Sequence, residues 1–360
     1  MKKHISRHEA VRRYRAAIGE WLKHNELHAC LMANENCRGR VCRSHSIQHK
    51  RVLQSIASQN QVYLFKPRPS TGFRLSRVGI RTATTFTGFC EHHDRELFAA
   101  IDFGDGRTFD PTSKEQTVLL SLRAVAMEYW KKLNMEKLHH LLVSCAASGD
   151  LERLQQILNL DEMHARQFAS SVDDSARPYL EGIRIGVRRL SRVYESLLSQ
   201  THKGKFHLSV VRVYAMEGTG SVATSSAFMP EYDFKGIKLL PLHPYVDPYY
   251  VALNVIPLDG RTWVAFLWHR RFSAQLSSLF SQLDEMSATE RAMVLSKMIV
   301  VHCENVALAP HYVEGLDEDI RLAIEEAFSR TVLEASPYDA VREVDFFGGA
   351  VQAVSWPRGR

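Results

Sequence analysis

The chain has 360 residues, of which 45% are hydrophobic and 24% are charged, so it is long enough for more than one typical domain with full hydrophobic cores. Its sequence has no run of about 18 apolar residues, which argues against a membrane span, and its basic amino terminus lacks the apolar stretch of a signal peptide. The formal net charge of +6 leaves an anionic partner open.

The first third of the chain combines short regular elements with two Cys/His clusters. We expect a basic amphipathic helix within residues 1–27, because apolar residues recur there at helical spacing. Residues 28–110 should form a separate module that holds both clusters. Within it we expect a short helix over 46–60, strands over 61–65 and 79–87, and a helix beginning near His93.

The remainder of the chain divides into a helical part and a mixed part. The turn-rich stretch 104–115 marks a boundary. Residues 116–203 read as long amphipathic helices. Residues 204–345 alternate strand-like and helix-like segments and should form an α+β domain with an antiparallel sheet. The predicted strands are 206–214, 222–229, 249–256 and 262–268, and the predicted helices are 274–284, 288–306 and 316–331.

The basic excess lies in the segment that carries the Cys/His clusters. Residues 1–115 contain 20 Lys and Arg against 11 Asp and Glu, whereas the rest contains 26 against 29. A local excess of this kind favours a polyanionic partner, and we expect nucleic acid. The basic side chains nearest the first cluster are the candidate contacts: Arg38, Arg40, Arg43, Lys50 and Arg51.

Six cysteines in a chain of this length do not make a disulfide framework, and a reducing cytoplasm is the expected setting. Structural zinc takes four Cys or His ligands. Cys37 and Cys42, with Gly39 allowing a tight turn between them, supply one pair, and Cys90 and His93 supply the second. Cys30 or His92 could replace one member. The simpler alternative is that these cysteines are reduced and packed as small apolar groups.

His45 follows the first pair by three residues. If four other side chains hold the zinc, a neutral His45 beside the metal could activate water for attack on a phosphodiester. His45 could equally be a zinc ligand itself, and the sequence leaves both roles open.

This arrangement resembles the treble-clef (ββα-metal) zinc fold of HNH-type endonucleases over about residues 28–104. Cys37 and Cys42 match the first pair, His45 with Ile47 the catalytic segment, and Cys90 with His93 the second knuckle. The resemblance implies His45 as general base, a structural zinc, and Mg²⁺ or another divalent ion for catalysis. Asp94 best matches the last motif position and is the second catalytic candidate.

The chain departs from the HNH pattern in three ways. It has a single His where many members have a doublet, a longer interval between the knuckles, and only Asn60 near the usual asparagine. Asp94 could also be explained by the preference of helix starts for acidic residues.

Two functions follow as expectations. The first is a metal-dependent endonuclease acting on DNA or RNA, which by analogy of architecture could be an effector of a bacterial defence system. The second is a non-enzymatic, zinc-stabilised nucleic-acid-binding or regulatory protein with a degenerate treble clef. The domain over 204–345 could bind a protein partner in either case.

Overall fold

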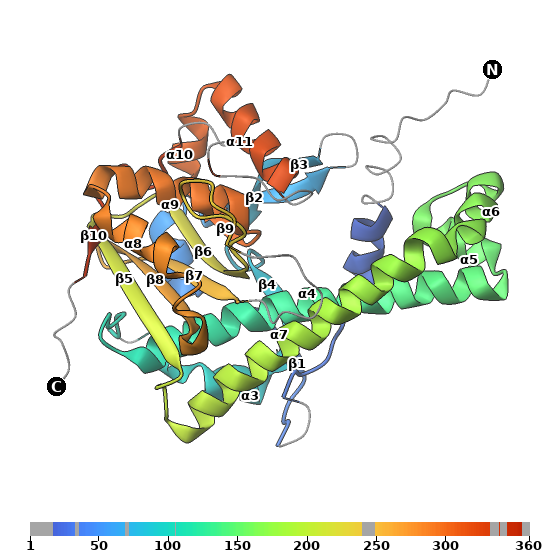
Figure 1. Ribbon diagram of the computed structural model, residues 1–360, viewed down its shortest axis with the longest axis horizontal. Helices are drawn as coiled ribbons and strands as arrows, with labels where there is room; N and C mark the ends of the chain where they lie inside the picture. The colour runs from blue at the N-terminus through green and yellow to red at the C-terminus, as the bar shows by residue number, and fades with distance from the viewer. Residues whose placement is uncertain are drawn as a thin grey trace.

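A large antiparallel sheet organises the computed structural model, which describes residues 17–32, 36–68, 72–104, 106–239, 249–331, 338 and 344–354. Eight strands form this sheet in the order β10-β5-β8-β7-β6-β9-β2-β3 (Figure 1). The α+β class expected from the sequence is confirmed. The strands are β2 (Gln61–Arg68), β3 (Gly72–Gly79), β5 (Ser209–Glu217), β6 (Val222–Phe228), β7 (Val251–Leu258), β8 (Arg261–His269), β9 (Val306–Leu308) and β10 (Gln352–Ala353).

Helices cover both faces of the sheet, as Figure 1 shows. Strand β7 explains why: Val251, Leu253 and Val255 belong to one buried core, whereas Ala252 and Ile256 belong to the other. This alternation matches the two-residue period of a strand with two covered faces. One face packs on α4 (Lys114–Ser148) and α7 (Arg177–Lys203), and the other on α8 (Ser277–Glu285), α9 (Ala288–His302) and α11 (Glu318–Thr331).

The two long helices α4 and α7 pack against each other and extend beyond the sheet. The long helices predicted over 116–203 are present, and the first of them, α4, ends at Gly149, whose φ of +73° suits the left-handed end of a helix. Asp150 then caps α5 (Leu151–Leu158), and α6 (Glu162–Ser170) follows. None of the described helices is long and apolar enough to cross a membrane.

The strand predicted over 79–87 was wrong in its position. The chain turns there, since the amides of Thr82 and Ala83 both donate to the carbonyl of Gly79 and Thr84 has a φ of +58°. Strand β3 ends before this turn and β4 (Thr85–Cys90) begins after it. Strand β4 pairs with β1 (Val41–His45) in a separate two-stranded sheet, and α3 (Glu91–Leu97) follows directly.

The amino-terminal segments are built into the main fold. Strands β2 and β3 lie within the expected zinc module, yet β2 pairs with β9 of the carboxy-terminal part. Between the clusters, the predicted helix over 46–60 is short, with η1 (His49–Leu53) and α2 (Gln54–Ile56). Residues 17–25 are helical, while residues 1–16 of the expected amino-terminal helix lie outside the described part of the chain.

Asn305 ties the small sheet to the large one. Its Nδ2 donates to Ser46 Oγ and to the carbonyl of Ser225, both at 2.8 Å, and Ser46 Oγ in turn donates to the carbonyl of Thr84. All of these groups are buried. The bridge fixes the end of β1 to the carboxy-terminal half of the protein.

We expect Asn305→Ala to destabilise the protein by roughly 1–3 kcal/mol, because it leaves buried acceptors without a donor. Urea denaturation followed by tryptophan fluorescence would measure this change. Asn305→Asp has nearly the same shape and lacks the N–H donors, so it should be destabilised at least as much. A variant with parental stability would contradict the role of the bridge.

Candidate metal centre and the adjoining polar cluster

Four side chains from the amino-terminal part converge on one point: Cys30, Cys37, Cys90 and His93. Their donor atoms all lie within 4.8 Å of one another. The Nδ1 of His93 is 3.3 Å from Cys30 Sγ, 3.6 Å from Cys37 Sγ and 3.4 Å from Cys90 Sγ. A tetrahedral zinc with ordinary bond lengths separates its nitrogen and sulfur ligands by about 3.5 Å. The cluster could therefore hold a metal ion such as zinc.

Backbone hydrogen bonds bring these four residues together. The amide of Leu31 donates to the carbonyl of Gly88 at 2.8 Å, which places Cys30 beside the end of β4. A Cβ on Gly88 would lie 2.6 Å from the Phe86 ring, so a close approach here requires glycine. Cys90 is the N-cap residue of α3 and has an extended backbone conformation, and His93 follows within the first turn of the helix.

The loop that carries Cys37 is held in place by the start of α3. The amides of Glu91 and His92 donate to the carbonyls of Arg40 and Arg38, which join this loop to the start of α3. Gly39 has a φ of +75°, in keeping with the tight turn expected there. Arg40 also pairs with Glu91 on the surface at 2.9 Å.

Two of the thiols have shifted acidity. Burial raises the pKa of Cys30 to about 11. Burial also raises the pKa of Cys90, but the backbone amides of His93 and Arg38 and the neighbouring thiols outweigh it, so the net pKa lies below the usual value. Of these two thiols, Cys90 ionises more readily. Since the thiolate is the form that binds metal, an ion entering here would displace protons.

The structure brings together three of the four predicted ligands and substitutes Cys30 for Cys42. Cys42 lies within β1 opposite Phe89, where its Sγ is 3.5 Å from the Phe89 carbonyl and 3.6 Å from Ser44 Oγ. The pairing of β1 with β4 therefore places the Cys42 thiol outside the cluster of four donors. His92 is half-buried next to His93 and is not a member of the cluster.

His45 also stands apart from the four donors, at the end of β1. Its Nε2 donates to the carbonyl of Ile80 at 3.2 Å, which leaves Nδ1 as the acceptor of the neutral ring. The ring stacks on His49 with centroids 4.3 Å apart. Burial, followed by the charge of His49, lowers the pKa of His45 to about 4. The imidazole is therefore neutral at physiological pH.

A polar cluster surrounds His45, which we define as His45, His49, Asp94, Asp102 and Arg123. Arg123 comes from α4, lies buried over the Phe98 ring at 4.1 Å, and is 3.9 Å from Asp94 Oδ1. Burial lowers the pKa of Arg123, while Asp94 and then Asp102 act in the opposite direction. Asp102 likewise raises the pKa of His49, which burial and Lys50 lower. These charges are thus close enough to act on one another.

Two atoms of this cluster are buried with no hydrogen-bond partner among the described residues: Asp94 Oδ1 and Arg123 Nε. Buried polar atoms in proteins are nearly always satisfied, so each such atom calls for an explanation. One explanation is a group that binds between them.

The sequence offered partial signals for the residues it did not single out. His49 follows His45 by four residues, the spacing of neighbours on a helix, and Arg123 is a lone charge within the apolar run 118–127. Asp102 gave no signal of its own, because its place in the cluster depends on the turn after α3.

The predicted nucleic-acid contacts differ in their surroundings. Arg38, Arg43 and Lys50 are exposed, and so is Arg40 apart from its pairing with Glu91. Arg51 is half-buried and donates to the carbonyls of Phe103 and Arg107 and to Asp259. Its guanidinium is used within the fold, so Arg51 does not belong to the exposed basic surface.

The comparisons with known proteins add no family to these observations. None of the family models, the curated proteins or the solved structures matches the chain.

Proposed function

We propose that the protein is a zinc-stabilised, HNH-like endonuclease that cleaves a phosphodiester in DNA or RNA, with His45 as general base. The observation that carries the proposal is the position of His45: neutral, oriented by a backbone carbonyl, and placed in a charged cluster that includes Asp94, the residue after the candidate ligand His93. Geometry of this kind suits a group that takes a proton from an attacking water.

The order of elements supports a treble-clef-like module. Two candidate ligands, Cys30 and Cys37, precede β1, and His45 ends β1; after η1, α2, β2 and β3, Cys90 ends β4 and His93 lies in the first turn of α3. The resemblance found in the sequence implies the same order of a first ligand pair, a histidine and a second knuckle that opens a helix. In this proposal zinc is structural and closes the module, while His45 stays free of it.

The polar cluster would receive the scissile phosphate. Arg123 would offer positive charge to a phosphate oxygen, and the half-buried carboxylate of Asp94, whose Oδ1 is fully buried, would help hold a divalent ion. Among the described residues, the Cys/His centre is the one group of three or more Cys, His, Asp or Glu side chains whose donor atoms converge. A catalytic ion would therefore need most of its ligands from phosphate oxygens and water, which Mg²⁺ commonly accepts.

A cleavage assay tests the proposal. Purified protein with its zinc retained is incubated with supercoiled plasmid and with structured RNA, with Mg²⁺, with Mn²⁺ and without added ion. We expect cleavage that requires the added ion. Intact substrate after hours at micromolar protein under every condition would exclude the nuclease.

Two observations favour the second candidate, a zinc-stabilised nucleic-acid-binding protein without activity. A pKa of about 4 makes His45 a weak base, and the described residues provide no second converging ligand set. Arg38, Arg43 and Lys50 would then act by neutralising phosphates alone. Replacing all three by alanine should weaken binding uniformly across sequences and flatten the dependence of log affinity on log salt concentration by about one for each side chain that neutralised a phosphate. Unchanged binding by the triple variant would exclude this surface.

A further inference from the structure

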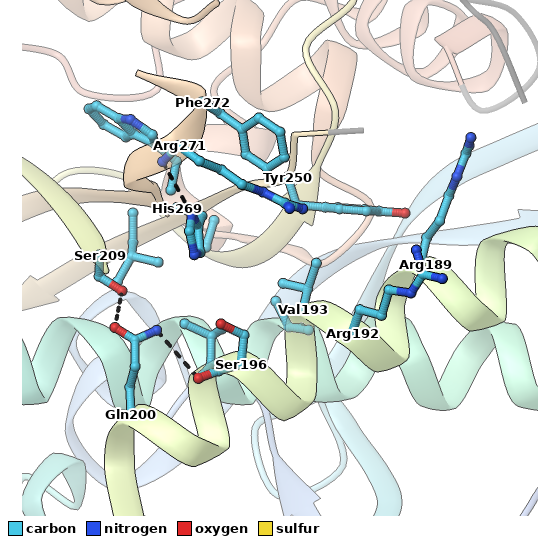
Figure 2. Close-up of a pocket in the computed structure, with 15 residues that line it drawn as sticks. Arg189, Arg192, Val193, Ser196, Gln200, Ser209, Tyr250, His269, Arg271 and Phe272 are labelled. Atoms are coloured by element: carbon cyan, nitrogen blue, oxygen red, sulfur yellow. Dashed lines mark hydrogen bonds between the residues drawn. The ribbon is translucent and has the colours of Figure 1, made fainter. Parts of the chain in front are cut away.

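A cavity of about 410 Å³ lies between α7 and the large sheet, and no residue of the Cys/His centre or of the polar cluster is among the described residues that line it. Figure 2 shows the side chains of α7 on one side and those that follow β8 on the other. Its floor is apolar, with Val125 of α4, Leu197 of α7, and Ala252 and Leu267 of the sheet. A volume of this size is typical of sites that take a small organic ligand, roughly 300–1,000 Å³.

The wall of the cavity is strongly basic. Arg189 and Arg192 come from α7, Arg271 comes from the segment after β8, and His269 lies beside Arg271. None of the fifteen described residues that line the cavity is acidic. A guanidinium has five N–H donors, so each arginine can keep a partner within the chain and still bind an anion. Arginines gathered from two elements around one cavity are typical of phosphate recognition.

Aromatic rings and uncharged polar groups complete the wall. Tyr250 and Phe272 face the cavity with the arginines (Figure 2). Phe272 already carries the Arg271 guanidinium 4.4 Å from its ring centre, and burial raises the pKa of Tyr250 to about 12, which keeps its hydroxyl a donor. Buried Gln200 accepts from Ser209 Oγ at 3.0 Å and its Nε2 donates to the carbonyl of Ser196. A planar heterocycle can stack on such rings, and a sugar or base edge can use the amide and hydroxyls.

We propose that this cavity binds a nucleotide, with the phosphate on Arg189, Arg192 and Arg271 and the base against Tyr250 and Phe272. Each of the three features selects part of the ligand. The arginines favour an anionic group such as phosphate, the aromatic side chains favour a planar ring, and the volume suits about one nucleoside unit. The site is independent of the nuclease proposal, because binding is measured without cleavage.

Titration calorimetry on the full-length protein tests the site with defined probes. The probes are the four ribonucleoside 5′-monophosphates, ATP, adenosine and inorganic pyrophosphate. We expect at least one nucleotide to bind with micromolar affinity, at least tenfold more tightly than its nucleoside or pyrophosphate alone. Equal affinity for pyrophosphate would reduce the site to an anion site and overturn the nucleotide assignment, as would an absence of nucleotide binding at millimolar concentration.

Single and double variants test whether the nucleotide binds in this cavity. Arg271→Ala and the double variant Arg189→Ala/Arg192→Ala should each weaken the nucleotide at least tenfold, and Tyr250→Ala should weaken it while leaving pyrophosphate unchanged. Arg188→Ala is the matched control: it removes a neighbouring arginine of α7 that pairs with Glu181 and does not line the cavity. Thermal unfolding confirms that each variant folds. Equal losses in Arg188→Ala, or none in the cavity variants, would refute the assignment.

Discussion

If zinc occupies the Cys/His centre, removing it should loosen the segments around Cys30, Cys37, Cys90 and His93 and lower the stability of the whole protein. Cys30 and Cys90 are buried members of the core that also contains β4 and α4, so the ion would anchor that core. Structural zinc contributes an apparent free energy of roughly 10–16 kcal/mol to the fold of small zinc domains. Cys30 and Cys90 belong here to a large hydrophobic core that would also stabilise the fold without the ion, so the effect should be smaller. We expect treatment with a strong chelator to lower the melting temperature by roughly 5–10 °C, equivalent to a few kcal/mol.

Variants of single ligands make this prediction specific. Cys30→Ser and Cys90→Ser should lose the zinc measured by elemental analysis and should melt early. Cys42→Ser should retain one zinc per chain, because Cys42 lies outside the cluster; it is the matched control from the same segment. A protein that binds no zinc when produced with zinc in excess, or a Cys42→Ser variant that loses it while Cys30→Ser keeps it, would disprove the assigned ligand set.

If the protein is the proposed nuclease, replacing His45 should strongly slow cleavage without loss of zinc. If His45 is the general base, His45→Ala should reduce the cleavage rate by about 10²–10⁴-fold, the usual contribution of a positioned base. Zinc content and melting temperature should stay close to those of the parent, since His45 is not among the converging ligands. His24→Ala is the control, because His24 is exposed on the first described helix and should leave the rate unchanged. A His45→Ala variant that cleaves at the parental rate would eliminate this role.

The pH profile separates His45 from an ordinary histidine. A base whose pKa is lowered to about 4 stays neutral as the pH falls from 7 to 5.5, whereas an unperturbed histidine is about nine-tenths protonated at pH 5.5. Cleavage should therefore hold nearly constant over this range, with zinc occupancy measured in parallel. The same shift makes the folded state less stable in acid: the contribution is complete above the unfolded pKa of about 6.5 and declines as the pH falls toward 4.

The sequence predicted the residue types of the candidate metal centre better than the particular residues that form it. Type and clustering identified Cys37, Cys90 and His93, because few other side chains bind zinc. The choice between Cys30 and Cys42 depends on strand pairing and on the hydrogen bond from Leu31 to Gly88, neither of which has a local signature. Proximity along the chain favoured Cys42, and tertiary structure favoured Cys30.

The fold shows the same division between local and long-range information. Helices and central strands followed from their apolar periodicity, with boundaries displaced where Gly149 and the turn after Gly79 end an element. Strand β9 was missed, and its first residue, Val306, was assigned to the end of a helix, since three residues carry too little pattern. Its position between β6 and β2 is a long-range pairing that no local pattern predicts.

That position of β9 has a consequence for synthesis on the ribosome. Strands β2 and β3 are made early, but β2 gains its second neighbour only when residues 306–308 have left the exit tunnel. Until then the hairpin presents an unpaired strand edge, the feature that most readily recruits another chain. We therefore expect fragments that stop before β9 to aggregate. The amino-terminal module completes its assembly late, with the last sixth of the chain.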